Sequence, residues 1–404
     1  MARIQYREME GRSGGFGALL AVLGAVILAG LGAAWTMEHH GHVITGMSNR
    51  IVWGTPHVFA VFLIVAASGA LNVASIASVF GRAIYKPLSR LSGLLALTLL
   101  AGGLAILVLD LGRPDRLIVA MTHYNFKSIF AWNIFLYIGF FAVVALYLWT
   151  MFERRMNGYT KRAGLLAFLW RLILTTGTGS IFGFLVAREA YNSALLAPLF
   201  IVMSFSFGLA IFVLVLMSAY RWSGRALGDV VLERLGKLLG VFVAAVLYFV
   251  AVYHLTNLYI ARQHDVERFI LLEGGVYTAL FWIGQVFVGG IVPLALVFAP
   301  GMRSVRSSRI ALAVAAACVI AGGLAQLSVI IIGGQAYPQL MFPGKDVSSS
   351  FFDGVVAAYT PSLPEVALSA GGVALALALT VVGLKLLPFL PRSLADSDLE
   401  SCAA

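Results

Sequence analysis

Charged residues are scarce in this chain, and their scarcity argues against a soluble globular protein. Asp, Glu, Lys and Arg make up 11% of the 404 residues, whereas soluble domains carry about 25%. Hydrophobic residues make up 60%, which is more than the core of a soluble domain needs. Lipid is therefore the expected solvent for most of the chain.

Cysteine is almost missing, since Cys318 and Cys402 are the only two. The sequence contains no C-x-x-C, no C-x-x-C-H and no spacing typical of zinc ligands. Iron–sulfur clusters and covalently attached haem both need more cysteines than this. We therefore expect no haem, no iron–sulfur cluster and no metal site within this chain.

Long apolar runs are what the sequence has in abundance. A membrane-spanning helix needs about 20 mostly apolar residues. Ten segments meet this length: 16–35, 55–80, 91–109, 129–151, 164–187, 195–220, 235–261, 274–298, 310–333 and 364–387. The runs are continuous rather than alternating, which favours helices over a β-barrel. The predicted fold is an all-α integral membrane protein of about ten helices.

The first segment has a second interpretation, because Arg3, Arg7 and Arg12 before an apolar run also suit a signal peptide. A signal peptide has an apolar region of about 7–15 residues and a small-residue cleavage site. The run 16–35 is longer and ends without such a site. We expect a retained helix.

The distribution of basic residues predicts the orientation. With ten spans, the loops on the side of the two termini hold 19 Lys and Arg, and the opposite loops hold 8. Lys and Arg concentrate in cytoplasmic loops, so both termini are predicted to be cytoplasmic, in a bacterial inner membrane. The net charge of +10 then reflects contact with anionic membrane lipid, not with nucleic acid.

All seven histidines fall on the opposite, outer side under this topology. We expect four of them to be ordinary solvated loop residues: His39, His40, His123 and His264. His57 and His254 differ because both belong to predicted helices, where a polar ring is unfavourable in lipid. These two are candidates for ligand or proton chemistry.

A polar stripe runs along the second span. His57, Ser68, Asn72 and Ser75 share one face at 3.6 residues per turn. Such a face lines a water-filled cavity, or its Ser and Asn side chains make hydrogen bonds between helices. The sequence leaves both interpretations open.

The fifth span carries a second stripe. Arg171, Thr175, Thr178 and Glu189 lie at helical spacing, with Glu189 five whole turns after Arg171. One interpretation is a polar route for protons, with Asn72 as a further member. The other is that Arg171 reaches the cytoplasmic surface along its aliphatic stem.

Asp110 stands at the outer end of the third span, in the turn 110–116 (DLGRPDR). Its carboxylate could pair with Arg113 or Arg116 and staple a helix-ending turn. Alternatively, it accepts a proton at a redox site.

The polar residues at the outer ends of spans two, three, five and seven suit a quinone head group, which needs hydrogen-bond donors, proton acceptors and a flat apolar lining. We predict His57, Asp110 and Glu189 as catalytic residues. The predicted quinone-binding residues are His57, Trp53, Asp110, Arg188, Tyr191 and His254. The expected ligand is menaquinone or ubiquinone.

Several stretches are similar to a known family. Residues 37–47 (MEHHGHVITGM), 51–59 (IVWGTPHVF), 110–116, the run 175–180 (TTGTGS) and 188–191 (REAY) resemble the membrane subunits of the polysulfide reductase/NrfD family. The resemblance implies two four-helix bundles, 55–187 and 195–333, with peripheral helices at 16–35 and 364–387. It also implies a quinol site at the outer ends of the first bundle.

The ten-helix length resembles the DsrP type of this family, the quinone-interacting subunit of the DsrMKJOP complex. This implies an oxidoreductase complex of dissimilatory sulfur metabolism that exchanges electrons between quinone and an outer iron–sulfur partner. The implied partners are a periplasmic iron–sulfur subunit (DsrO-like), a multihaem cytochrome c (DsrJ-like) and cytochrome b and iron–sulfur subunits (DsrM- and DsrK-like).

Three other functions fit the sequence. A secondary transporter would use the Gly pairs at 102–103, 289–290 and 322–323 as helix breaks around a midplane site. A cytochrome b would ligate haem between His57 and His254. A plain membrane anchor would have no site at all.

Overall fold

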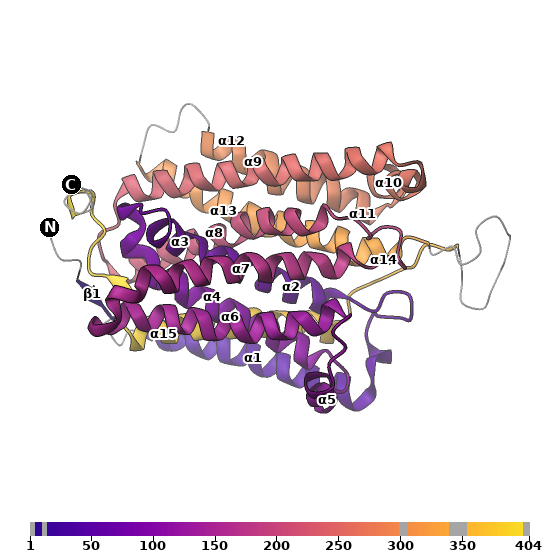
Figure 1. Ribbon diagram of the computed structural model, residues 1–404, viewed down its shortest axis with the longest axis horizontal. Coiled ribbons are helices and arrows are strands. Elements are labelled where there is room, and N and C mark those ends of the chain that lie inside the picture. Colours follow the sequence, from indigo (N-terminus) through magenta and orange to yellow (C-terminus); the bar gives the residue numbers. More distant parts are fainter. Residues whose placement is uncertain (1–4, 10–13, 299–304, 339–353, 399–404) are drawn as a thin grey trace.

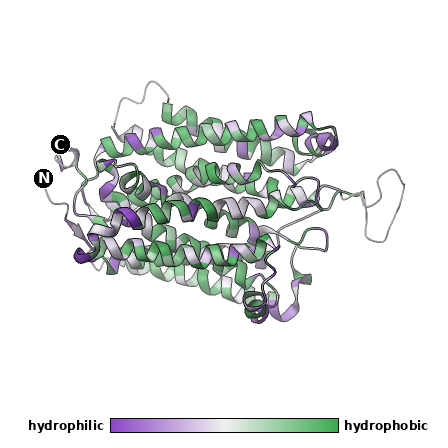
Figure 2. Cartoon of the chain, viewed as in Figure 1, coloured by the Kyte–Doolittle hydropathy of each residue, from purple (hydrophilic) through white to green (hydrophobic). Residues whose placement is uncertain are grey.

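The computed structural model describes residues 5–9, 14–298, 305–338 and 354–398 (Figure 1). Within these residues, ten helices are long and apolar enough to cross a membrane, which confirms the prediction of an all-α membrane protein. The apolar residues run along the helices, and the polar ones gather toward the ends (Figure 2). The fold is therefore a bundle with lipid-facing sides and two polar ends.

The ten spans are made of the following elements: α1 (Gly14–His40); α2 (Thr55–Ala70) with α3 (Asn72–Ser78); η2 (Ala83–Leu88) with α4 (Ser89–Leu109); α6 (Ile129–Phe152); η4 (Arg154–Tyr159) with α7 (Thr160–Gly183); α8 (Leu196–Ser223); α9 (Asp229–Tyr259); α11 (Val276–Ala279), η7 (Leu280–Ile291) and α12 (Val292–Phe298); α13 (Val305–Ser328), η8 (Val329–Gly333) and α14 (Gly334–Ala336); and α15 (Leu363–Leu386).

Short elements connect the spans at the end opposite the termini: η1 (His42–Ile44), η3 (Pro114–Arg116), α5 (Leu117–Thr122), η5 (Ala261–Gln263), α10 (His264–Arg268) and η6 (Phe269–Glu273). In Figure 1, α5, α10 and α14 lie at this end, and the N- and C-termini lie at the other. Two short strands, β1 (Tyr6–Arg7) and β2 (Leu390–Pro391), pair antiparallel and hold the terminal segments together.

The helix α2 is the centre of the bundle. In its most apolar stretch 89% of the residues are buried, against 17% in α1 and in α6. Helices α4, α8, α15, α13 and α7 all pack on α2. Helix α1 packs along α15, which in turn packs on α4 and α2. The division into two four-helix bundles with two peripheral helices stays a prediction.

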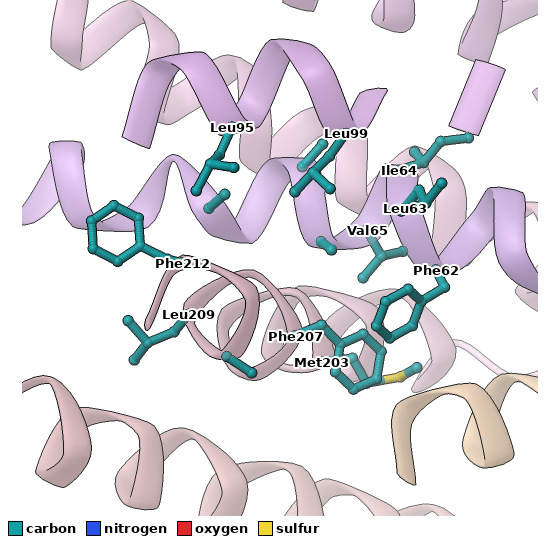
Figure 3. Close-up of a cluster of buried hydrophobic side chains, with 14 of the residues drawn as sticks. Phe62, Leu63, Ile64, Val65, Leu95, Leu99, Met203, Phe207, Leu209 and Phe212 are labelled. Carbon is teal, nitrogen blue, oxygen red and sulfur yellow. The ribbon is translucent and has the colours of Figure 1, made fainter. Parts of the chain in front are cut away.

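Small residues allow the helices to approach closely, which is how helices associate in lipid. A Cβ on Gly208 would lie 2.2 Å from the carbonyl carbon of Gly69, so α8 and α2 touch backbone to backbone. Phe62 and Phe207 stack beside this contact, with ring centroids 5.1 Å apart (Figure 3). The same close approach joins Gly289 of η7 to Gly322 of α13. These glycines therefore account for close packing between the helices.

The fifth span ends earlier than predicted. Helix α7 stops at Gly183, and the chain returns at Ser193, whose carbonyl oxygen would lie 2.8 Å from a Cβ on Gly183. Glu189 therefore lies in the following loop, and its predicted place on the stripe with Arg171 is wrong. Of the two interpretations of Arg171, the one in which it reaches the cytoplasmic surface is wrong, because Arg171 is 1% exposed and lies midway along α7.

Candidate functional site

Asp110 is placed by the end of α4. Its backbone N–H donates to the carbonyl of Ile106, and the chain then turns through Gly112 at a φ of +68°. A Cβ at Gly112 would lie 3.0 Å from the ring of His42, so glycine suits both the turn and the neighbour. The carboxylate of Asp110 points into the bundle and its side chain is fully buried.

Two histidines surround this carboxylate. His57, in the first turn of α2, places Nδ1 3.0 Å from Asp110 Oδ2. His42, in η1, places Nε2 3.5 Å from Oδ1 and 3.1 Å from the Asp110 carbonyl oxygen. The turn-stapling pair with Arg113 or Arg116 is therefore wrong, because the partners of Asp110 come from distant segments. His42 had not been singled out as a site residue from the sequence.

The contacts around Asp110 are close but lack regular hydrogen-bond geometry. Neither carboxylate oxygen of Asp110, nor Nδ1 of His57, has a hydrogen-bond partner of good geometry among the described residues. A buried carboxylate of this kind retains acceptor capacity for a hydroxyl group. The side chain of His57 is 23% exposed, so its ring can be reached from outside, whereas the Asp110 carboxylate and Nδ1 of His57 are buried. These acceptors fit a quinol, whose two hydroxyls are hydrogen-bond donors.

An aromatic wall lies next to His57. The ring of Trp53 lies 6.2 Å from that of His57 and 6.4 Å from that of Tyr191, with the latter pair stacked. The ring centroids of Phe182 and Phe130 lie 5.7 and 5.9 Å from that of Trp53. Flat apolar surfaces beside a few polar groups are typical of small-molecule sites. Four of the predicted site residues thus lie together, and their role stays a prediction: His57, Asp110, Trp53 and Tyr191.

Gln335, in α14, holds this wall in place and was missed in the sequence. Its Oε1 accepts from the backbone N–H groups of Val52 and Trp53, and its Nε2 donates to the Trp53 carbonyl. Arg188 donates to the carbonyls of Gln335 and Arg50. Arg188 therefore fastens the outer loops together behind Trp53.

Tyr191 is 2% exposed, and its hydroxyl donates to the carbonyl of Ile331. Burial raises the pKa of Tyr191, while the nearby Arg188 cation lowers it in part. The phenol therefore stays protonated at physiological pH. Its ring offers an apolar face to Trp53, and its hydroxyl is already engaged.

Glu189 lies apart from this group. Its Oε1 is 3.7 Å from Nε of Arg262, and both residues line a surface cavity of about 90 Å³ with Tyr337. Burial, Glu189 and Asp265 together raise the pKa of Tyr337 to about 12. The structure does not bring Glu189 next to His57 or Asp110.

His254 belongs to another cluster. Its Nδ1 lies 2.6 Å from Oε2 of Glu267, which is 1% exposed, and Asn257 donates to Oε1 of the same carboxylate. The rings in contact with His254 are those of Tyr253 and Phe281. The placement of His254 in the quinone site stays a prediction, and its contacts favour a separate role.

Three of the predicted proton-path residues, Asn72, Arg171 and Thr175, are linked with Ser68 by hydrogen bonds between α7 and α2–α3. Arg171 Nη2 donates to the side-chain oxygen of Asn72, and Thr175 donates to Ser68 Oγ. Thr178 donates to the carbonyl of Leu174 within its own helix. The other side-chain nitrogens of Arg171, Nε and Nη1, have no hydrogen-bond partner among the described residues. The stripe therefore lies inside the bundle, where lipid does not reach it.

Comparison with known proteins supplies independent evidence. Residues 43–339 match the family described as "Polysulphide reductase, NrfD". The "Hdr-like menaquinol oxidoreductase integral membrane subunit" of Archaeoglobus fulgidus is 30% identical over 98% of this chain and 99% of its own length. A putative dimethyl sulfoxide reductase membrane subunit of Halobacterium salinarum is 27% identical over 94% of this chain and 92% of its own length. A polysulfide reductase component of Wolinella succinogenes is 24% identical over 72% of this chain and 96% of its own length.

Proposed function

Since the chain belongs to the polysulphide reductase NrfD family, we propose that it is the quinone-interacting membrane subunit of an oxidoreductase complex. Its relatives are named as components of menaquinol oxidoreductase, dimethyl sulfoxide reductase and polysulfide reductase. The chain would exchange electrons between the membrane quinone pool and an iron–sulfur partner on the outer face. The name of the Archaeoglobus relative favours menaquinone over ubiquinone.

One observation carries the assignment of the site: the buried carboxylate of Asp110, which lies 3.0 Å from His57 Nδ1 beside the Trp53 ring. Quinol oxidation releases two protons and two electrons, so the site needs a proton acceptor close to the head group. A carboxylate facing Nδ1 favours a proton on that nitrogen and leaves Nε2 of the same imidazole as the acceptor. Asp110 then stabilises the positive charge that forms on His57.

The remaining residues position the ligand rather than react with it. Trp53 and Tyr191 supply an apolar wall, and Arg188 with Gln335 fixes the backbone behind it. Electrons leave the site to a partner that holds the clusters, because this chain has too few cysteines to hold one. The same groups serve the reverse reaction, in which a protonated His57 donates to a quinone.

We extend the proposal to the complex as well. The DsrP type of the family would work in dissimilatory sulfur metabolism with DsrO-, DsrJ-, DsrM- and DsrK-like partners. With both termini cytoplasmic, the His57–Asp110 site lies near the outer face of the inner membrane, where a periplasmic iron–sulfur subunit can dock. The buried side chains of Asn72, Arg171, Thr175 and Thr178 are the candidate proton route from this site toward the inside, and hydrogen bonds join the first three.

The other functions have less support. A haem between His57 and His254 has no support, because the two histidines belong to separate clusters around Asp110 and Glu267. A transporter midplane site built on glycine breaks has no support at Gly289 and Gly322, which pack against one another. The redox function accounts for the family, the buried carboxylate and the aromatic wall together.

The test uses the purified intact complex in lipid nanodiscs. A reduced menaquinone analogue is added, and reduction of the partner clusters is followed by absorbance. We expect His57→Gln to slow the reduction at least about tenfold, because a positioned base contributes about 10²–10⁴-fold. His123→Gln is the matched control, since His123 lies exposed in the next outer loop.

Subunit composition of both variants is checked by gel filtration, so that loss of assembly is not taken for loss of the site. Unchanged rates and unchanged quinone binding in the His57→Gln complex would remove this residue from the site. A wild-type complex that binds no quinone and shows no quinol-linked reduction would overturn the proposed function as a whole.

A further inference from the structure

A second buried polar cluster lies around His254, close to the loop that carries Tyr191. It borders an internal cavity of about 40 Å³. The polar side chains that line this cavity are Tyr253, His254, Glu267, Gln285 and Gln326. The other lining residues come from α8, α9, α10, η6, η8 and neighbouring loops, and they are apolar.

Glu267 reaches this cavity from an unusual direction. After α9 ends at Tyr259, the chain folds back through η5 and α10 against the end of that helix. Val266, Phe269 and Ile270 bury the apolar side of this segment, and Glu267 enters with them at 1% exposure. Burial of a carboxylate is unfavourable unless partners compensate for the lost water. His254 and Asn257 are those partners, at 2.6 and 2.8 Å.

Irregular helical segments surround the cavity. Three stretches of the described chain are π-helical: η6, η7 and η8. Each contributes lining residues, with Ile270 from η6, Gln285 from η7 and Val329 from η8. Such wide turns lose the regular hydrogen-bond ladder, and they occur frequently at functional sites. Their coincidence at one small cavity singles it out within the bundle.

The cavity has polar side chains in a mainly apolar lining, and it is large enough for water. Gln326 is 2% exposed, and its Nε2 has no hydrogen-bond partner among the described residues. Gln285, opposite it in the lining, is 6% exposed. A water molecule needs about 10–15 Å³ of this kind of volume and two to four polar partners, so about two or three waters fit. Gln326, Gln285, Glu267 and His254 supply those partners.

The charges near the pair are few. The titratable side chains in the lining are Tyr253, His254 and Glu267. The lining residues that come from α8, η6, η7, α13 and η8 carry no charge. On α10 itself, His264, Asp265 and Arg268 are exposed. Arg268 pairs with the exposed Glu273, and His264 contacts the Leu258 carbonyl. The imidazole of His254 is therefore the group that can compensate the Glu267 charge.

We propose that His254, Glu267 and the adjoining hydrated cavity form a proton-binding site separate from the quinone site. The pair binds one proton, which moves between Glu267 Oε2 and His254 Nδ1 across 2.6 Å and exchanges with cavity water. The ligand is thus water together with a proton, and no electrons are transferred. Tyr253 connects this site to the Tyr191 loop, because its hydroxyl donates to the carbonyl of Ala190.

The test measures protonation directly and needs no quinol. The full chain is labelled with ¹³C-glutamate, placed in nanodiscs and taken through a pH change from about 4 to 9, which spans the ordinary carboxyl and imidazole range. Infrared difference spectra are recorded in H₂O and D₂O. We expect a labelled carboxyl signal from a buried group and a signal from weakly bonded internal water.

Glu267→Gln should remove one component of the buried carboxyl signal, while Glu365, which is also buried, keeps its own contribution. Glu273→Gln is the matched control, because Glu273 lies on the same outer segment but is exposed, and it should leave the signal unchanged. A buried carboxyl signal that is the same in Glu267→Gln as in the wild type would overturn the proposal. Thermal unfolding in detergent is recorded for every variant to verify its fold.

Two further variants keep the test decisive if Glu267→Gln does not fold. His254→Gln should shift the carboxyl band, because the hydrogen bond at 2.6 Å is lost or weakened. Gln326→Leu should remove the internal water signal and leave the fold intact. An unshifted carboxyl band together with an unaltered water signal would exclude the site. These outcomes do not depend on quinone binding.

Discussion

Replacing Asp110 by Asn is expected to slow quinol oxidation strongly while leaving the complex assembled. The substitution keeps the size of a side chain that is fully buried at the end of α4. It removes a negative charge that lies 3.0 Å from His57 and 3.5 Å from His42. Neither histidine has to stay charged in the variant, so no isolated buried charge is created. The effect should therefore fall on the reaction rather than on folding.

The magnitude follows from the charge that forms on His57 when it accepts a proton. Two unit charges about 4 Å apart attract by about 4 kcal/mol at the effective dielectric constant near a protein surface. Partial exposure of His57, at 23%, reduces this, and we take about 2–3 kcal/mol as lost. Since 1.36 kcal/mol changes a rate tenfold, the expected loss is about 30- to 150-fold.

The assay is menaquinol-analogue oxidation by the purified complex in nanodiscs, with partner-cluster reduction as the readout. Asp115→Asn serves as the control, because Asp115 is an exposed acid in the same outer turn and should keep the wild-type rate. Subunit stoichiometry confirms assembly of both variants. A rate within about threefold of wild type in assembled Asp110→Asn would refute the role given to this carboxylate.

Three further perturbations have defined outcomes. Gly208→Ala should destabilise the fold by about 1–3 kcal/mol in detergent unfolding, because its Cβ meets the α2 backbone, whereas Gly32→Ala, in open space, should not. Arg171→Met should keep the fold, since an apolar side chain of similar size replaces an incompletely bonded cation, but it should lower proton uptake from the inside in proteoliposomes. Glu189→Gln should lower the pKa of Tyr337 from about 12, because a negatively charged neighbour is lost. Absorbance titration at alkaline pH measures this pKa, with Tyr337→Phe as the reference that identifies the Tyr337 signal. Equal unfolding of Gly208→Ala and Gly32→Ala would contradict the packing argument. Unchanged proton uptake in Arg171→Met would contradict the proton route. An unchanged pKa of Tyr337 in Glu189→Gln would contradict the contact between these two residues.

The spans were predictable because lipid imposes a simple requirement. Each crossing needs a continuous apolar run of about 20 residues, and ten such runs are visible in the sequence. The inward position of the Asn72 and Arg171 stripes followed from the same rule, since lipid excludes polar faces. Ser68 and Thr175 then meet across the two helices that carry them. Periodicity alone was sufficient for this part of the fold.

Pairings between distant segments were not predictable in this way. Asp110 was expected to pair with Arg113 or Arg116 because they are its neighbours in sequence, but helix packing supplies His57 and His42 instead. Glu189 was placed by extending helical periodicity past Gly183, where the helix ends.

Some site residues gave weak signals or none. Gln335 is uncharged and lies at the end of a span, so nothing in the sequence distinguished it from the polar residues that commonly end a membrane helix. Glu267 did leave a trace, because an acid between Val266 and the apolar pair Phe269 and Ile270 is unusual for a solvated loop. A search for acids within short apolar stretches outside the spans would have found it.

The position of α1 has a consequence for the order in which the chain is assembled. Its main packing partner is α15, the tenth spanning helix of the described chain, and the strand pair β1–β2 joins the segments next to these two helices. During synthesis α1 is therefore made eight spans before its partner and is exposed to lipid until α15 is inserted. A chain that stalls before α15 would leave its first helix unpartnered.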